Sequence, residues 1–560
     1  MAKVTGLWVA LGVLVSSLVV LVAPPGPPGG TPASAAERVA SAAESQRPNI
    51  VVVMADDMRV DDLRFAPRLR RLVARRGVTF QNAFSPNPLC CPARASFLTG
   101  VHAHRHRVWS HERPWGYQAF DDSRTIATSL RRAGYRTGFV GKYLNGYGRQ
   151  RSQVSGGPSY RYVPRGWSDW RASLENPGVK GIHGGTYYYF NTPYNVNGRV
   201  DNRYRGRYQT TVLGDFSVGM ARRFGRQRNP FFMYVNYVAP HHGAPREPDD
   251  PGSVADRRGR RDYYSTPARP RWVRGKFDRV VTRAAGLPRG GGPSERDVSD
   301  KPRFRTRLEP TRQERRALRE VSRQRAESVF VMDQQIGRLV RTLKRTGEWS
   351  NTVFVFTSDN GYFQGEHRTR QGKVLGHEPS LRVPLLMTGP GFRGGRPHGR
   401  LRDDPATLLD LSATILDLAN AKPPYRPDGS SRLTTLRRGD QGWSVPVLHE
   451  SGWGGGARVN GFTDVRTSIG VRTARYALLR YRRGGELYDL SVDAVQNQSV
   501  WKDEDYRPVK RELLAVWRRL KDCVADECQQ PLPDSLATDP AQTRSLTRSY
   551  WRQVDRVYGW

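Results

Sequence analysis

The sequence predicts an α/β domain with a large, mainly parallel sheet, followed by a smaller α+β domain. Short apolar runs recur along the chain, helical patterns separate them, and this sequence pattern changes near residue 421. The runs are rich in β-branched and aromatic side chains, as expected for strands that are buried on both faces. They occupy residues 49–54, 137–140, 230–238 and 352–357. Because strands that alternate with helices form mainly parallel sheets, this order predicts an α/β domain over residues 48–420.

Two of the separating segments have the pattern of an amphipathic helix. Residues 125–133 place Ile126 and Leu130 on one face and lead into Gly134. Residues 325–345 carry apolar side chains at three- and four-residue spacing, which predicts a helix with one buried face. These side chains are Val329, Met332, Ile336, Val340 and Leu343.

Residues 150–310 are rich in Gly, Tyr and Arg, and we expect them to form long loops between core strands. These loops would cover one end of the sheet. The stretch 254–316 is densely basic, and here a solvated loop is favoured over a dedicated binding patch. The tyrosines between Tyr187 and Tyr208 suit packing at least as well as stacking on sugar rings.

Beyond residue 421, strand-like pieces such as residues 476–481 follow turns that are rich in Pro and Gly. A helix is predicted over residues 507–520. We therefore expect a C-terminal subdomain over residues 421–530 and a polar tail over residues 531–560.

The first 35 residues have the features of a signal peptide. Lys3 precedes an uncharged apolar stretch over residues 7–23, and Ala33-Ser34-Ala35 forms a plausible cleavage site. Residues 36–47 then form a linker. The apolar stretch is long for a signal peptide, so an uncleaved N-terminal anchor is the alternative. Either way we expect an exported protein, secreted or at the cell surface, with no membrane contact unless the leader is retained.

Cys523 and Cys528 are separated by four residues in a loop-like context. In an exported protein such a pair predicts a small disulfide, because no further Cys or His lies nearby in the sequence to complete a zinc site.

The composition is strongly basic. The chain has 91 Lys and Arg residues against 52 Asp and Glu residues, which gives a net charge of +39. Such a field attracts polyanions of every kind. The chain has no zinc-finger cysteine spacing and no RNA-binding signature, so we expect no nucleic-acid partner. An Arg-rich composition without a role and a polyanionic substrate both remain open.

Polar residues follow two of the predicted strands. Asp56-Asp57 comes after residues 49–54, and Asp359-Asn360 comes after residues 352–357. In α/β sheets, ligands gather at the carboxyl edge of the strands. Three carboxylates and one amide oxygen suit a hard cation, Ca²⁺ or Mg²⁺, and not zinc. Loop capping is the alternative for each pair taken alone.

The segment from Cys90 to Gly100 contains the pattern C-x-P-x-R followed by Leu98-Thr99-Gly100. This combination resembles the type I sulfatases, in which the first Cys is oxidised to Cα-formylglycine (3-oxoalanine) by a separate formylglycine-generating enzyme. The resemblance covers residues 47–530. It implies an alkaline-phosphatase-like sulfatase fold, in which helices flank a large, mainly parallel sheet. It also implies a smaller C-terminal α+β domain with a short antiparallel sheet.

The resemblance also implies roles for individual residues. Asp56, Asp57, Asp359 and Asn360 look like the family's metal ligands, with the formylglycine from Cys90 as a fifth and with Ca²⁺ favoured over Mg²⁺. Arg94 would hold the formylglycine. The sulfate would be bound by Lys142 in Gly141-Lys142-Tyr143, by His241 in Ala239-Pro240-His241, and by Lys373, which is paired with Glu378 in a Lys-x4-Glu pattern. Either His241 or Lys373 would protonate the leaving alcohol.

Within the family, these motifs look most like N-acetylglucosamine-6-sulfatases and extracellular heparan sulfatases. They imply a sulfated carbohydrate substrate carrying 6-O-sulfate esters.

The chain departs from the family pattern at the position that often holds the base, a His in Gly-Lys-x-His. Here that position is Leu144, which leaves the proton acceptor open, with His367 and His377 as candidates because they are near Lys373 in the sequence. His367 is also counted as a substrate-binding candidate. Ala93 replaces the usual Ser of the cysteine motif, which the minimal recognition element does not require.

The alternating His102, His104 and His106 could suggest zinc, but a structural role is favoured for them. Two rival functions remain open. One is a phosphodiesterase or phosphonate monoester hydrolase of the same superfamily, and the other is a catalytically idle, basic glycan-binding protein.

Overall fold

The computed structural model describes residues 47–304, 307–392, 399–452 and 466–560. The predicted leader (residues 1–35) and all but the last residue of the linker lie outside this part of the chain. Within the described part, no helix is both long enough and apolar enough to cross a membrane. The chain from Arg47 to Trp560 forms one unit.

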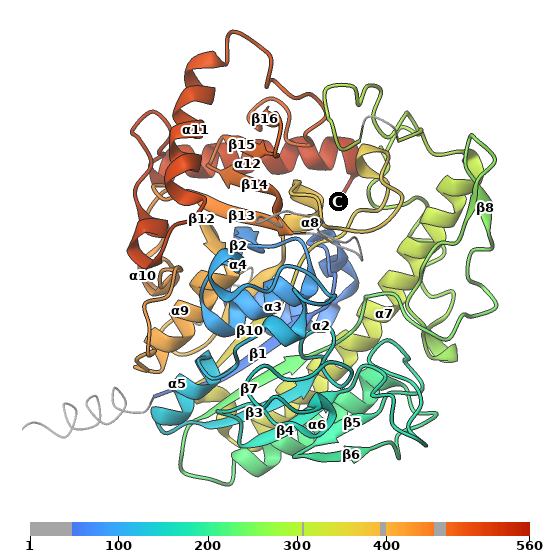
Figure 1. Cartoon of the computed structure of the whole chain (residues 1–560), viewed down its shortest axis with the longest axis vertical. Helices are drawn as coiled ribbons and strands as arrows, with labels where there is room; N and C mark the ends of the chain where they lie inside the picture. Colours follow the sequence, from blue (N-terminus) through green and yellow to red (C-terminus); the bar gives the residue numbers. More distant parts are fainter. Residues whose placement is uncertain (1–46, 305–306, 393–398, 453–465) are drawn as a thin grey trace, which may run out of the picture. The chain divides into compact units, whose positions relative to one another are not determined.

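A ten-stranded sheet runs through this unit in the order β12-β2-β11-β10-β1-β7-β3-β4-β5-β6 (Figure 1). The strands are β1 (Asn49–Ala55), β2 (Val78–Phe84), β3 (Arg136–Gly141), β4 (Asp169–Ser173), β5 (Tyr194–Val196), β6 (Arg199–Asp201), β7 (Phe231–Asn236), β10 (Thr352–Ser358), β11 (Leu385–Thr388) and β12 (Arg400–Thr407). The five strands from β10 to β4 are parallel, as are β2 and β12, whereas β11, β5 and β6 pair antiparallel with their neighbours. The predicted fold class, with a mainly parallel sheet, is confirmed.

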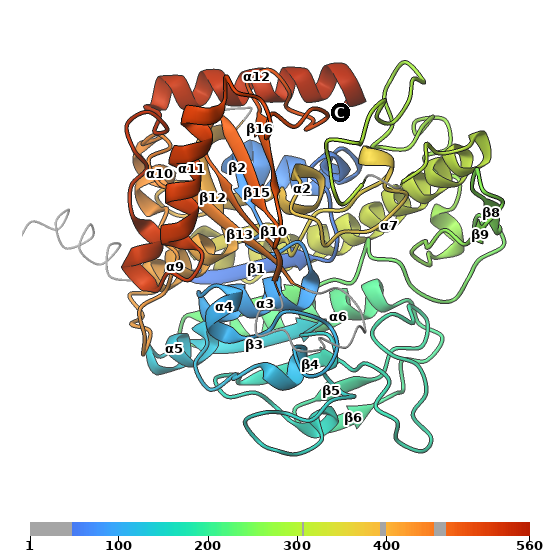
Figure 2. The same cartoon turned by 45° about the horizontal axis from the view of Figure 1, so that its top comes forward.

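Helices cover both faces of this sheet (Figures 1 and 2). They are α2 (Pro67–Leu72), α3 (Cys90–Thr99), α4 (Ala103–His106), α5 (Ile126–Arg132), α6 (Gln209–Phe224), α7 (Arg312–Arg345), α8 (Glu378–Leu381), α9 (Leu408–Leu418) and α10 (Leu433–Arg438). Side chains alternate along β1, so Val52 joins the core under α3 and α9 while Val53 joins the core under α6 and α7. Burial on both faces explains why the strand is apolar throughout.

The loop prediction for residues 150–310 was partly wrong. This stretch contains β4, β5 and β6, which extend the sheet at one end, and α6, which packs on one of its faces. The predicted strand at residues 230–238 is present as β7. From residue 237 to residue 304, and from residue 307 to residue 311, the chain is largely irregular, with the two-stranded hairpin of β8 (Val254–Ala255) and β9 (Arg261–Asp262). Helix α7 begins 13 residues before the predicted residue 325, because Thr311 and Glu314 form a capping box at its amino end.

The second sheet is antiparallel and has four strands, β13 (Val447–Gly452), β14 (Arg466–Arg472), β15 (Tyr476–Arg480) and β16 (Gly485–Asp489). Helix α11 (Arg507–Leu520) packs on one face through Leu513 and Val516. Helix α12 (Pro540–Tyr558) packs on the other face through Tyr550 and Val554. The segment expected as a polar tail therefore contains a long helix with a buried apolar side (Figure 2).

Candidate active site

Four neighbouring parallel strands bring polar side chains to one edge of the large sheet. These residues are Lys142 after β3, His241 after β7, Asp56 and Asp57 after β1, and Asp359 and Asn360 after β10. The register aligns the strand ends, because Ala55 pairs with Ser358 and Met54 pairs with Asn236. This carboxyl edge is where α/β sheets bind their ligands.

Cys90 reaches this edge from the first turn of α3. Its Sγ atom lies 3.1 Å from Oδ1 of Asp56 and 3.7 Å from Oδ1 of Asp57, and the side chain is fully buried. Cys91 points elsewhere, because its Sγ atom lies 3.7 Å from the backbone oxygen of Asn145. Of the two adjacent cysteines, Cys90 is the one that faces the carboxylates.

The backbone around α3 fixes where Cys90 lies. Leu89 is extended, with φ of −158° and ψ of 135°, so the helix begins at residue 90. It ends at Gly100, whose φ of 72° is the left-handed conformation that glycine adopts without strain. The amino end of a helix presents free N–H groups and the positive end of the helix dipole. Residue 90 is therefore placed where a bound anion is stabilised.

Two lysines neutralise the carboxylates. Nζ of Lys142 lies 2.6 Å from Oδ2 of Asp56, and Nζ of Lys373 bonds Asp57 and lies 2.7 Å from Sγ of Cys90. Burial lowers the pKa of each lysine, but the surrounding negative charges, first Asp56 for Lys142 and Asp57 for Lys373, together raise it above its ordinary value. Both ammonium groups therefore stay charged.

A divalent cation fits the oxygen atoms of this site. Oδ2 of Asp57 and Oδ1 of Asn360 are buried and have no hydrogen-bond partner in the described part of the chain. Nδ2 of Asn360 donates to Oδ1 of Asp57 at 2.7 Å, which leaves the amide oxygen free. Ligand atoms of Asp56, Asp57, Cys90 and His241 lie within 4.8 Å of one another. Buried oxygen atoms without donors are costly, and oxygen ligands of this kind suit Ca²⁺ or Mg²⁺.

Two buried arginines hold the strand ends together. Nε of Arg94 lies 2.8 Å from Oδ2 of Asp359, and its Nη1 donates to Oδ1 of Asn236 and to the backbone oxygen of Lys142, both at 3.0 Å. Arg94 thereby joins β10, β7 and β3. Arg325 of α7 donates from Nη2 to the backbone oxygen of Asp57 at 2.6 Å. No local sequence pattern pointed to Asn236 or Arg325 as residues of this site.

His241 closes the site from the β7 side. Its Nε2 atom lies 3.6 Å from Oδ2 of Asp57, and its Nδ1 atom lies 2.7 Å from the backbone oxygen of His242. Because that oxygen can only accept, Nδ1 carries the proton and Nε2 of the neutral ring has a free lone pair. The ring lies 4.6 Å from that of Tyr187, which also lies 5.1 Å from Nζ of Lys142.

The family model named Sulfatase matches residues 48–421, more than half of the chain. The chain belongs to the sulfatase family. A second model, described as the C-terminal part of N-sulphoglucosamine sulphohydrolase, matches residues 365–523 of this sulfatase.

Individual relatives agree with this assignment. An arylsulfatase of Volvox carteri is 33% identical to this sulfatase and covers 92% of it, with 81% of the relative aligned. Human N-acetylglucosamine-6-sulfatase is 29% identical over 73% of this chain and 68% of its own. An extracellular sulfatase SULF-1 homolog of Drosophila melanogaster is 28% identical over 71% of this chain, which spans only 32% of that relative. The expected class of enzyme, a sulfuric ester hydrolase, is confirmed.

Solved structures confirm the fold. One protein, solved in complex with its substrate D-glucosamine-2-N,6-O-disulfate, gives a TM-score of 0.61 at 20% identity, covering 84% of this chain and 97% of that one. A phosphonate monoester hydrolase from Silicibacter pomeroyi gives 0.59 at 21% identity, covering 88% and 99%. At these identities the similarity concerns the fold alone.

The position at which many sulfatases have a histidine is apolar in this one. Leu144 is buried in the core with Tyr143 and Tyr147. A different histidine, His111, was missed by the sequence reasoning. Its Nε2 atom is buried and has no hydrogen-bond partner among the described residues. Burial, and after it the charges of Lys373 and Lys142, lower the pKa of His111 well below its ordinary value.

His111 is tied to the loop that follows Lys142. Nε2 of Gln150 donates to the backbone oxygen of His111 at 3.3 Å, and the same glutamine accepts a hydrogen bond from the backbone of Gln118. His111 lies in an irregular segment between α4 and residue 117, where local patterns give no hint of the imidazole's position.

The other two candidate bases, His367 and His377, lie away from Asp56 and Asp57. Nδ1 of His367 lies 2.7 Å from Oε2 of Glu295, and Nε2 of His377 lies 2.8 Å from Oε2 of Glu486. Their rings are 5.2 Å apart and pack against Phe304. Nearness to Lys373 in sequence was misleading, because the chain turns between residues 367 and 373.

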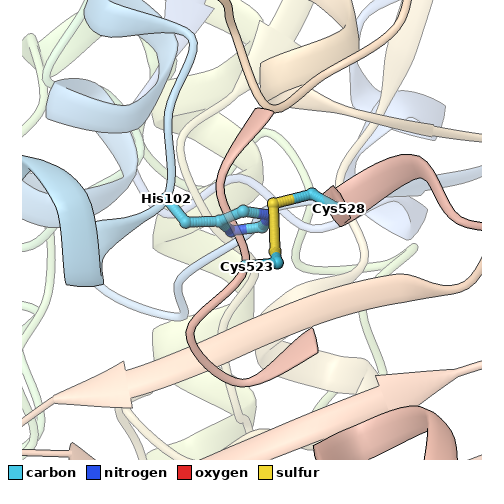
Figure 3. Close-up of side chains that lie close together, drawn as sticks. All are labelled: His102, Cys523 and Cys528. Carbon is cyan, nitrogen blue, oxygen red and sulfur yellow. A yellow bond between two sulfur atoms is a disulfide. The ribbon is translucent and has the colours of Figure 1, made fainter. Parts of the chain in front are cut away.

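The three alternating histidines support packing. Figure 3 shows His102 against the sulfur atoms of Cys523 and Cys528, which form a disulfide with an S–S distance of 2.08 Å. Sulfur atoms joined in a disulfide are not thiolates and do not hold zinc. His104 bonds Glu450 at 3.0 Å, and His106 bonds Ser96 at 2.9 Å.

Proposed function

We propose that this sulfatase hydrolyses sulfate monoesters on carbohydrate, specifically the 6-O-sulfate of N-acetylglucosamine units, with a nucleophile made from Cys90. The position of Cys90 carries the proposal: it begins α3, faces Asp56 and Asp57, and lies 2.7 Å from Nζ of Lys373. Related proteins named N-acetylglucosamine-6-sulfatase support the choice of sugar.

The chain's own groups bind the sulfate. Lys142 and Lys373 are buried cations beside residue 90, and the amino end of α3 adds its backbone N–H groups. In a site sealed from water these charges act strongly on sulfate oxygens, because water no longer screens them. Arg94 keeps Asp359 in place, so we assign it a positioning role.

Asp56, Asp57, Asp359 and Asn360 would hold one divalent cation, Ca²⁺ in preference to Mg²⁺. With the formylglycine in place, this cation would act as a Lewis acid that makes a hydroxyl group a better nucleophile at neutral pH. Conversion of Cys90 requires a formylglycine-generating enzyme as a partner during maturation.

Two histidines move protons. His241, whose neutral ring has a free lone pair at Nε2, would accept a proton there and return it to the leaving oxygen. His111 would be the second proton acceptor, through its Nε2 atom, for which the described residues offer no hydrogen-bond partner. It would take the role of the histidine that many sulfatases have at the position of Leu144. A bound sulfate adds negative charge near His111 and raises its pKa toward the neutral range, where a base is effective.

Residues 1–35 would direct export, with a sulfated glycan outside the cell as substrate. Extracellular relatives support this location. Residues 48–420 would form the catalytic domain and residues 421–530 a subdomain that braces it.

Parallel assays test this function. Purified protein, produced with the converting enzyme, is given N-acetylglucosamine-6-sulfate, an aryl sulfate and an aryl phosphonate ester. We expect turnover of both sulfates, with kcat/KM above that for the phosphonate. Faster phosphonate turnover would assign the chain to phosphonate hydrolysis, and absence of all turnover would favour an idle glycan-binding protein.

A further inference from the structure

A cleft of about 600 Å³ lies between the β8–β9 hairpin and the segment that leads to Lys373. The β8–β9 hairpin, the start of α7, residues 307–308 and the segment before Lys373 line it. Its lining carries six arginines, Arg258, Arg260, Arg261, Arg307, Arg368 and Arg370, against the three carboxylates of Asp256, Asp262 and Glu314. We call it the arginine cleft. Its volume is within the range of ligand-binding pockets.

Ion pairs within the lining leave part of its positive charge unmatched. Asp256 bonds Arg260 at 2.7 Å, and Glu314 holds Arg370 through two contacts of 2.8 Å. In the described part of the chain, Arg258, Arg261 and Arg307 have no carboxylate within ion-pair distance. These three guanidinium groups can therefore receive an external anion.

Among these three arginines, Arg307 has the strongest reason to bind an external anion. Its Nη1 atom bonds the neutral hydroxyl of Thr369, and it lies beside the positive charge of Arg370. Burial, and after it Arg370, lower the pKa of Arg307 to about 10. Two like charges in a half-buried position repel each other, and an anion bound between them relieves that repulsion.

The cleft also offers an aromatic surface. Tyr263 is 60% exposed, and Arg246 lies over its ring at 4.5 Å. An exposed tyrosine beside arginines combines an apolar face for a sugar ring with charges for its sulfate groups.

Short chain segments and hydrogen bonds connect the lining to the active site. The side-chain amide of Gln371 makes two hydrogen bonds, of 2.9 and 2.8 Å, to the backbone of Ser265. The next residue, Thr266, accepts from the backbone of Gly243, two residues after His241. Lys373 follows Arg370 by three residues, so their Cα atoms are at most about 11 Å apart. One short oligosaccharide can therefore reach both places.

We propose that the arginine cleft is a second binding site, which holds sulfate or carboxylate groups of a polyanionic sulfated oligosaccharide while another sulfate of the same chain occupies the active site. This inference rests on the proposed function, because it takes the substrate to be a sulfated glycan. The preferred substrate is then an oligosaccharide with several charges and not a monosaccharide.

A binding experiment tests the cleft without catalysis. The double variant R258A/R261A removes two exposed charges, and R226A/R228A removes two exposed charges before β7, at the amino edge of the sheet. The probe is a fluorescent heparin-derived hexasaccharide at physiological salt. We expect R258A/R261A to weaken binding about tenfold and to reduce its dependence on salt, because each lost ion contact removes attraction that salt screens. R226A/R228A should change binding by less than about twofold.

A kinetic measurement then links the cleft to the substrate. The ratio of kcat/KM for the hexasaccharide to kcat/KM for an aryl sulfate should fall about tenfold in R258A/R261A. Unchanged hexasaccharide binding in R258A/R261A, or equal losses in both double variants, would overturn the proposal. Equally tight binding of single-stranded DNA of the same charge, lost in the same variant, would also overturn it in favour of a nucleic-acid site. Selective loss of hexasaccharide binding in a protein that hydrolyses no sulfate would support the cleft while refuting the proposed function.

Discussion

Nζ of Lys373 lies 2.7 Å from Sγ of Cys90 and also bonds the carboxylate of Asp57. One side chain thus connects the residue proposed to become the nucleophile with a proposed metal ligand. Lys373 comes from the irregular segment before α8, and Cys90 begins α3, so the contact depends on the whole fold.

Replacing Lys373 by Ala should lower kcat/KM for an aryl sulfate about 10²- to 10³-fold, because a buried cation that stabilises sulfate oxygens is lost. Steady-state kinetics measure this loss, and mass spectrometry checks that residue 90 is still converted. The control is K422A, which removes an exposed lysine in the segment after α9. Activity of K373A within about twofold of wild type would contradict the assigned role.

Removal of the cation should abolish activity and lower thermal stability. Adding Ca²⁺ back after treatment with a chelator should restore both the activity and the thermal stability, because a cation that binds only the folded state stabilises it by mass action. In N360A, which loses a free amide oxygen at the site, the Tm should rise less at the same Ca²⁺ concentration. The same Tm increase in N360A and wild type would exclude Asn360 as a ligand.

Replacing His111 by Gln should lower kcat about 10²-fold, the usual contribution of a general base. The pKa of His111 is depressed in the free protein, so the imidazole stays neutral at pH values below the ordinary pKa of histidine. The kcat/KM of the wild type, which reports the free enzyme, should therefore decline only at acid pH, and H111Q should lose that decline. The exposed His183 offers a matched control, H183Q. An identical pH profile in H111Q would refute the role as a proton acceptor.

Glu378 should stabilise the fold in a pH-dependent way. Its carboxylate bonds Arg382, directly after α8, at 2.7 Å and Arg472 of β14 at 2.8 Å. This contact connects the small sheet to the chain beside the large one. Burial raises the pKa of Glu378, but the two arginines together lower it by more. The pKa therefore falls from 4.5 to about 2. Because the folded pKa lies below the unfolded one, this stabilisation is fully present above pH ~4.5 and is lost as the pH falls toward 2.

The variant E378Q should therefore cost about 3 kcal/mol at pH 7, and the difference should shrink by about 1 kcal/mol at pH 3.5. Urea unfolding at the two pH values measures it. E504Q, at an exposed glutamate before α11, is the control. A difference between E378Q and wild type that stays constant with pH would show that the carboxylate charge is not what stabilises the contact.

Strand ends and motifs could be predicted from the sequence because both depend on local pattern. The buried runs of β1 and β10 end directly before Asp56 and Asp359, so parallel pairing alone brings these carboxylates together. The cysteine motif likewise places residue 90 at a helix start. The chemistry at the sheet edge was therefore visible before the structure.

Other parts had no local signal. Strands β5 and β6 have three residues each and carry Asn, Arg and Asp, so nothing distinguishes them from loops. Helix α6 contains Gly214 and Gly219, which lower helix propensity although Phe216 and Met220 face the core. His111 and Arg325 reach the site through tertiary packing, which spacing cannot reveal. The capping box of Thr311 and Glu314 was present in the sequence and could have extended α7.

The central claim is that Cys90 becomes the nucleophile, and mass spectrometry of the tryptic peptide 77–94 tests it most directly. This peptide contains both Cys90 and Cys91, and fragmentation assigns any change to one of them. In protein produced with the converting enzyme, we predict the mass loss for thiol to aldehyde at residue 90, no change at residue 91, and activity that is lost in C90A but retained in C91S. An active protein with an unmodified Cys90 would contradict the account.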